Sequence, residues 1–223
     1  LLATTGPLVQ HWYGITESKE PYHLYALSNI ASFIALGAYP FLIEPMFTLS
    51  FQKSFWLGLF VVFAALYAAI AIFFLRSHAH TAVERPKATP LVDKLRWIGL
   101  ASLPAALLVA VTSELTQAVA PVPFLWILPL ALYLLTFVLA FRGWGNRGIV
   151  PMLVIASAGV AYLFLGYTYE ALTRQMLAYL AFFFFTCLYC HAELYAARPQ
   201  RGSSALFYLC ISLGGMIGTI LVS

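Results

Sequence analysis

Charged side chains make up only 9% of this 223-residue chain, so the few that interrupt its apolar runs are the first candidates for chemistry. Glu44 directly follows the apolar string Tyr-Pro-Phe-Leu-Ile, and Glu114 lies near the end of a second apolar run. Because a charged group is costly in an apolar setting, two carboxylates that face one vestibule could bind a cation or relay protons. The alternative is that both acids cap or hydrate helix ends.

Asn29 is a third polar candidate, because it lies with Ser28 in the first turns of an apolar stretch. An amide in such a place usually forms a hydrogen bond to a neighbouring helix. A contact with a substrate is the alternative interpretation.

The string Cys187-Leu-Tyr-Cys190-His191 has the spacing of a c-type haem attachment site, in which two thiols bond to the haem and the histidine ligates iron. Haem attachment takes place on the non-cytoplasmic face, whereas the distribution of Lys and Arg places this string near the cytoplasm, so no cofactor is predicted. In the competing interpretation the thiols pack in the core, and His191 and Glu193 meet water at a helix end. Metal binding with a histidine from residues 78–80 is a third alternative.

Motifs of soluble enzymes are absent from the sequence. It contains no G-x-S-x-G, P-loop, HExxH or GxGxxG arrangement, so nothing in it supports an assignment as a hydrolase, an NTPase or a dinucleotide-binding enzyme. The sequence therefore identifies no catalytic residue.

The elements that must position these candidates are apolar helices. Hydrophobic residues make up 62% of the chain and aromatic residues 16%, and a helix crosses about 30 Å of hydrocarbon with about 20 apolar residues. We therefore predict an all-α integral membrane protein with a polytopic bundle of about seven transmembrane helices. Their expected ranges are 23–43, 54–75, 97–117, 124–141, 149–168, 175–195 and 204–222.

The basic residues give these spans a direction. Of the twelve Lys and Arg residues, all but Lys53 and Arg174 fall on one side of the membrane once the spans are drawn. Because cytoplasmic loops collect Lys and Arg, the loops 76–96, 142–147 and 198–201 are predicted to be cytoplasmic and the membrane to be the bacterial inner membrane.

Tryptophan supports the assignment, because its ring prefers the headgroup level. All five tryptophans fall at or near expected helix ends: Trp12, Trp56, Trp97, Trp126 and Trp144. The expected partners are therefore the lipid bilayer and other membrane subunits. Nucleic acid is excluded as a partner, because the basic residues form no dense stripe.

Proline and glycine mark boundaries and packing positions. Pro40 and Pro45 are expected near a helix end, where a missing N–H matters least. Pro104 and Pro129 are expected inside helices, which they should kink.

Glycines in the last expected helix favour close packing. Gly214 and Gly218 have the GxxxG spacing that permits close contact between helix backbones, and Gly215 lies beside them. We predict ordinary helix packing for all three glycines.

Both ends of the chain suggest a segment of a longer protein. Residues 1–22 are expected to form the tail of a preceding helix and a cytoplasmic loop, and residues 23–223 the seven-helix transmembrane domain.

Several strings occur in a characteristic order and spacing: TTGPLVQ at 4–10, PYHLYALSN at 21–29, YPFLIEP at 39–45, PFLWILPLALYL at 123–134, CHAEL at 190–194 with Arg198-Pro199, and FYL at 207–209 with SLGG at 212–215. Together they resemble the membrane region of bacterial proteins described as fused MFS-like transporter/spermidine synthase. The resemblance covers nearly the whole chain. It implies further helices before the chain and often an aminopropyltransferase-like domain after it, and it assigns no catalytic residue to this segment.

Three functional hypotheses result. The first is the membrane domain of a transporter-like protein for a polyamine or another cation, with Glu44, Glu114 and Asn29 as contacts. The alternative is an accessory subunit that packs within a larger membrane complex through aromatic faces such as the phenylalanine run 182–185. The third is a haem-bearing electron carrier.

Overall fold

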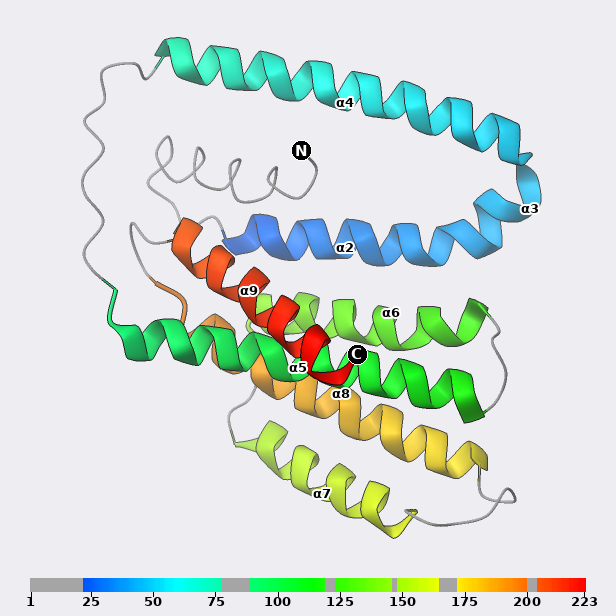
Figure 1. Ribbon diagram of the computed structural model, residues 1–223, viewed down its shortest axis with the longest axis vertical. Helices are drawn as coiled ribbons and strands as arrows, with labels where there is room; N and C mark the ends of the chain where they lie inside the picture. Colours follow the sequence, from blue (N-terminus) through cyan, green and yellow to red (C-terminus); the bar gives the residue numbers. More distant parts are fainter. Residues whose placement is uncertain (1–21, 78–88, 119–122, 146–147, 165–171, 200–203) are drawn as a thin grey trace. The chain divides into compact units, whose positions relative to one another are not determined.

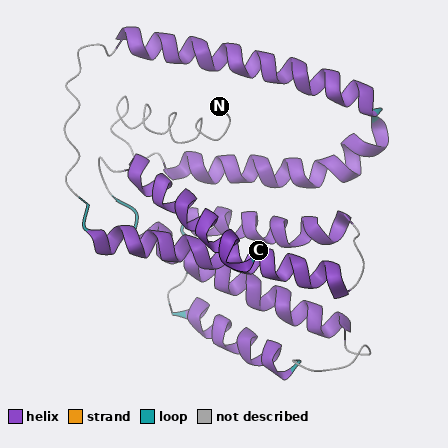
Figure 2. Cartoon of the chain, in the orientation of Figure 1, coloured by secondary structure: helices purple, strands orange, loops and turns teal. Residues whose placement is uncertain are grey.

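The computed structural model describes residues 22–77, 89–118, 123–145, 148–164, 172–199 and 204–223. Regular structure in these ranges is entirely helical, and none of the residues they contain lies in a strand (Figure 2). The elements are α2 (Tyr22–Ala38), η1 (Tyr39–Ile43), α3 (Glu44–Met46), α4 (Leu49–Ser77), α5 (Leu91–Ala118), α6 (Pro123–Phe141), α7 (Ile149–Leu163), α8 (Leu172–Ala196) and α9 (Ser204–Val222) (Figure 1).

Within the described ranges, five helical segments are long and apolar enough to cross a membrane: Ala26–Met46, Leu49–Phe73, Leu91–Gln117, Thr173–Ala196 and Ala205–Val222. The apolar parts of α6 and α7, Trp126–Phe141 and Ile149–Leu163, are shorter. The predicted fold class is confirmed, because the protein is an all-α membrane bundle. Each expected span coincides with a helix, and residues 165–168 of the fifth span lie outside the described residues.

The chain divides into two compact units, of which unit 2 comprises residues 34–86. Within unit 2 the π-helical turn η1 joins α2 to α3. Pro40 has no N–H to offer to the preceding turn, and the helix widens so that the backbone N–H of Glu44 donates to the carbonyl of Tyr39. Pro40 and Pro45 lie within the first two positions of η1 and α3, as expected of prolines near helix ends, although the apolar span continues to Met46.

The connection from α3 to α4 is fixed by Gln52. Its Nε2 donates to the carbonyl of Phe47 at 2.8 Å, and its Oε1 accepts from the hydroxyl of Tyr39 at 3.2 Å. Thr48 caps the start of α4, because its Oγ1 accepts from the N–H of Phe51 at 3.4 Å.

Unit 1 comprises residues 1–33 and 87–223. α8 contacts α5, α6 and α7, and α5 also packs along α9. The core of the unit contains large aromatic and aliphatic side chains, among them Trp97, Phe141, Leu194, Phe207 and Tyr208. In lipid, association of helices depends on close packing rather than on removal of apolar surface from water.

The contact between α5 and α9 depends on small residues. A Cβ atom at Gly214 would lie 2.5 Å from the carbonyl oxygen of Ile98, and one at Gly218 would collide with the carbonyl oxygen of Ser102. A Cβ at Gly215 would meet nothing within 4 Å. The GxxxG pair therefore lies against the backbone of α5, whereas Gly215 faces away from it.

Both internal prolines lie inside helices. α5 continues through Pro104 and α6 through Pro129, and the two rings are fully buried. Burial among neighbouring helices fits the rule that a bilayer helix tolerates proline where packing surrounds the interrupted hydrogen bond.

Candidate functional site

An ionisable side chain lies in the core of unit 1, because His191 of α8 is completely buried. Its Nδ1 atom lies 3.0 Å from the hydroxyl oxygen of Thr136 on α6. The imidazole stacks on Phe137 with 3.6 Å between ring centroids, and it meets Tyr133 edge-on at 5.1 Å. The three α6 residues are spaced i, i+3 and i+4, so one face of α6 forms the environment of His191.

The contacts of Thr136 determine which nitrogen of His191 carries a proton. The Thr136 hydroxyl donates its single proton to the carbonyl of Tyr133 at 2.7 Å. With its proton committed to Tyr133, the hydroxyl accepts from His191 in the tautomer that is protonated at Nδ1, and Nε2 is then the unprotonated acceptor. Nε2 is buried and has no hydrogen-bond partner within the described part of the chain.

The two cysteines of the Cys-x-x-Cys-His string are also in the core. Cys187 and Cys190 are buried, and neither forms a disulfide. In the ranges that the structure describes, no group of three or more His, Cys, Asp or Glu side chains could hold a metal ion. The histidines of residues 78–80 lie outside those ranges.

The expectation that His191 meets water at a helix end is wrong. α8 continues to Ala196 and its span to the same residue, so His191 lies more than one turn before the end. It also lies on the face that packs against α6. Glu193, two residues later, is only partly exposed. Its carboxylate forms an ion pair with Arg96 and is not simply hydrated.

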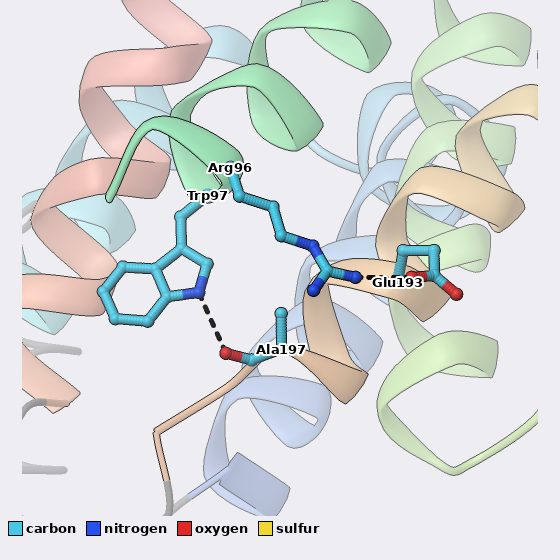
Figure 3. A network of polar contacts seen from close by, with 4 residues as sticks. All are labelled: Arg96, Trp97, Glu193 and Ala197. Atoms are coloured by element: carbon cyan, nitrogen blue, oxygen red, sulfur yellow. Dashed lines mark hydrogen bonds and ion pairs between the residues drawn. The ribbon is translucent and has the colours of Figure 1, made fainter. Parts of the chain in front are cut away.

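Two polar contacts tie the start of α5 to the end of α8 (Figure 3). Arg96 donates through Nη2 to Oε2 of Glu193 at 2.7 Å. Trp97 donates through Nε1 to the carbonyl oxygen of Ala197 at 2.9 Å. This carbonyl follows the last turn of α8, where backbone acceptors have no partner within the helix.

The sequence did not predict this pair of contacts, and the helix was expected to begin at residue 97. α5 begins at Leu91, so Trp97 lies in its second turn and is buried against Phe207, with 5.1 Å between ring centroids. The sequence does contain a signal for the earlier start of this helix. Asp93 follows Pro90 by three residues, and an acidic residue in the first turn after a proline is typical of a helix start.

Glu114 lies near the end of α5 and is exposed. Gln117 donates through Nε2 to the hydroxyl of Ser113 at 2.9 Å. The next residue, Leu115, faces the core with only 1% of its surface exposed. Among the described residues the carboxylate of Glu114 forms no hydrogen bond or ion pair.

The other two candidates are placed separately. Glu44 is exposed and begins α3 in unit 2, whereas Asn29 is partly buried on the portion of α2 that belongs to unit 1. Glu44 and Glu114 therefore belong to different units. Their sharing of one vestibule stays a prediction.

Comparison of the chain with protein-family models, with curated proteins and with solved structures gives no match.

Proposed function

We propose that this chain is the membrane domain of a transporter-like protein that moves an organic cation, with a polyamine as the first substrate to test. Two lines of support come together. Strings of the sequence have the order and spacing expected of fused MFS-like transporter/spermidine synthase proteins, and five of the described helical segments are long and apolar enough to cross a membrane.

The proposal depends on the position of Glu114. It is an exposed carboxylate at the end of the apolar span Leu91–Gln117, and it forms no contact with another charged side chain of the described residues. An ammonium group and a carboxylate form a charge-assisted hydrogen bond, which is stronger than one between neutral groups. Ser113 and Gln117 add further polar atoms beside the carboxylate. Glu44 and Asn29 are the second and third proposed contacts.

In this proposal the membrane is the bacterial inner membrane, and the basic loops 76–96, 142–147 and 198–201 are cytoplasmic. α5 then begins at the cytoplasmic surface and ends with Glu114 at the outer surface. Glu114 would meet a cation that approaches from outside the cell.

Uptake of radiolabelled spermidine into proteoliposomes that contain the full-length protein tests the proposal. Glu114→Gln keeps the shape of the side chain and removes its charge. A hydrogen bond to a charged group contributes about 1.5–3 kcal/mol, so we expect the half-saturating spermidine concentration to rise about tenfold or more.

Asp93→Asn is the matched control, because it makes the same chemical change in the first turn of the same helix, at its opposite end. This variant should retain uptake close to wild type. Unchanged uptake in Glu114→Gln would exclude Glu114 as a contact, and absence of spermidine uptake by the wild-type protein would exclude polyamine transport.

A second candidate function, an accessory subunit of a membrane complex, is favoured by α4. None of the apolar window of its span Leu49–Phe73 is buried. Phe51 stacks on Phe47 and Phe55, with centroid distances of 4.9 and 5.9 Å, which gives the start of the helix a continuous aromatic face. The phenylalanine run 182–185 supports this function less, since Phe183 is fully buried in the fold.

Photo-crosslinking separates the two candidates. A benzophenone amino acid at Trp56 of α4 should give a discrete protein adduct in native membranes if α4 contacts another subunit. The control position is Ile155 of α7, which is also exposed. Lipid adducts alone at Trp56 would contradict the accessory function.

A further inference from the structure

We propose that the turn after α6 and the end of α8 form a binding site for the headgroup of an anionic phospholipid. Arg142 and Trp144 provide the turn's side of the site, and Tyr195 and Arg198 provide the other side. The proposal goes beyond transport, because it concerns the lipid that surrounds the protein rather than its substrate.

The turn has a fixed geometry. Gly143 adopts a φ of 83°, in the left-handed region that favours glycine at the end of a helix. Its N–H donates to the carbonyl of Ala140 at 3.0 Å, and the N–H of Trp144 donates to the carbonyl of Leu139 at 2.9 Å. These bonds close the end of α6 and hold Arg142 and Trp144 at a defined depth relative to the helix.

The same turn is packed onto α8. A Cβ atom at Gly145 would lie 2.5 Å from the Cβ of Ala192, so the backbone of the turn directly contacts α8. Phe141 and Tyr195 are in ring contact, with 5.2 Å between their centroids. The ends of α6 and α8, which carry Arg142 and Arg198, are therefore packed together.

Arg198 is held in place by the end of α8. Its guanidinium lies 3.8 Å from the centroid of the Tyr195 ring, and its Nη1 donates to the Tyr195 carbonyl at 2.8 Å. Stacking on an aromatic ring is a common use of the planar guanidinium, and it leaves Arg198 ordered before any ligand binds.

Arg142 is exposed and forms no ion pair or hydrogen bond through its side chain with the residues that the structure describes. Glu193, the acid near the end of α8, already binds Arg96 at 2.7 Å. The local charge is therefore positive. Two guanidinium groups on adjacent helix ends suit a phosphodiester, since arginine recognises phosphate oxygens through paired N–H donors.

Trp144 indicates that the phosphate belongs to a lipid. Its side chain is 69% exposed, although the chain offers an apolar core nearby. An exposed tryptophan at the end of a membrane helix is typical of the headgroup region. Basic pockets between membrane helices bind anionic headgroups by the same combination of charge and depth.

Native mass spectrometry of the full-length protein, released from bilayers with equal amounts of phosphatidylglycerol and phosphatidylcholine, tests the proposal. Wild-type protein should retain phosphatidylglycerol in preference to phosphatidylcholine. Arg142→Gln should lower this preference about fivefold, the effect of one basic residue near an anionic surface. Arg142→Lys keeps the charge and should retain most of the preference.

Arg174→Gln is the matched control, because it removes an exposed arginine at the opposite end of α8. Its lipid preference should equal that of wild type. The proposal is overturned if Arg142→Gln retains the wild-type preference, or if Arg174→Gln lowers it as much as Arg142→Gln does. Trp144→Ala provides a second variant, for which a reduced preference is also expected. The measurement requires no transport, so its failure is distinguishable from failure of the proposed function.

Discussion

The hydroxyl oxygen of Thr136 on α6 lies 3.0 Å from Nδ1 of His191 on α8, and it accepts the imidazole proton because its own proton is donated to Tyr133. Both side chains are fully buried. A displacement of either helix along the other would leave a donor and an acceptor unpaired in an apolar core, which is costly. We infer that this hydrogen bond helps to fix the register between α6 and α8.

Thr136→Val tests this inference, because it keeps the shape of the side chain and removes the acceptor. The Nδ1–H of His191 is then buried without a partner, and the free energy of unfolding should fall by about 1–3 kcal/mol. The measurement is reversible unfolding in mixed micelles with increasing denaturing detergent.

The control for Thr136→Val is Thr219→Val, since the Thr219 hydroxyl is exposed and donates only to the carbonyl of Gly215 in its own helix, at 2.9 Å. It should change stability by less than about 0.5 kcal/mol. The double variant Thr136→Val with His191→Phe removes both partners, and it should be less destabilised than the sum of the two single variants. Strict additivity would contradict a direct bond.

Gly218→Ala should separate α5 from α9. The added methyl group would overlap the carbonyl oxygen of Ser102, which belongs to helix backbone and cannot rotate away. Overpacking of this kind costs about 1–3 kcal/mol. Gly215→Ala is the matched control, because open space surrounds that position and replacing a helical glycine by alanine stabilises by about 0.5–1 kcal/mol. Equal effects of the two substitutions on detergent unfolding would exclude a GxxxG contact with α5.

Apolar length was sufficient to predict the helices, but it was insufficient to place their ends. α5 was expected from residue 97 and begins at Leu91, because Asp93, Lys94 and Arg96 make its first turns look like a loop. In the fold these polar residues remain helical at the surface of the bundle, where Arg96 pairs with Glu193. Such a pairing spans 97 positions of the sequence, and periodicity within one helix carries no information about it.

The same limit applies to the candidate site. Sequence analysis selected His191 from its local spacing, and it therefore considered haem, a metal ion or water as partners. The structure gives the partner as Thr136, which is 55 positions away on another helix. Thr136 is the only threonine of the run 124–141, but nothing in that run shows which helix it faces, since the pairing arises from the packing of α6 on α8.

The ion pair between Arg96 and Glu193 should contribute little to stability. The Arg96 side chain is 50% exposed, so solvent screens the interaction, and exposed pairs are worth about 0.2–1 kcal/mol. A double-mutant cycle with Arg96→Gln and Glu193→Gln should give a coupling free energy below about 1 kcal/mol.

Trp97→Phe keeps an aromatic ring at this position and removes the N–H that donates to Ala197. The free energy of unfolding should fall by about 1 kcal/mol or more, because the indole is buried. We therefore expect the Trp97 hydrogen bond to contribute more to stability than the ion pair. A coupling free energy of the ion pair well above the stability lost in Trp97→Phe would contradict this order.

Labelling of engineered cysteines tests the direction of the bundle. Pro90→Cys and Trp144→Cys lie at exposed positions near the start of α5 and the end of α6, and both should react with a membrane-impermeant maleimide from the cytoplasmic side. Arg174→Cys, at the start of α8, should react from the opposite side. The wild-type chain is the control, because its three cysteines are buried and should label slowly. Intact spheroplasts and inverted vesicles expose the two sides in turn. Reaction of the Pro90 and Trp144 variants from different compartments would contradict the proposed topology, because α5 and α6 could not then both cross the membrane between these positions.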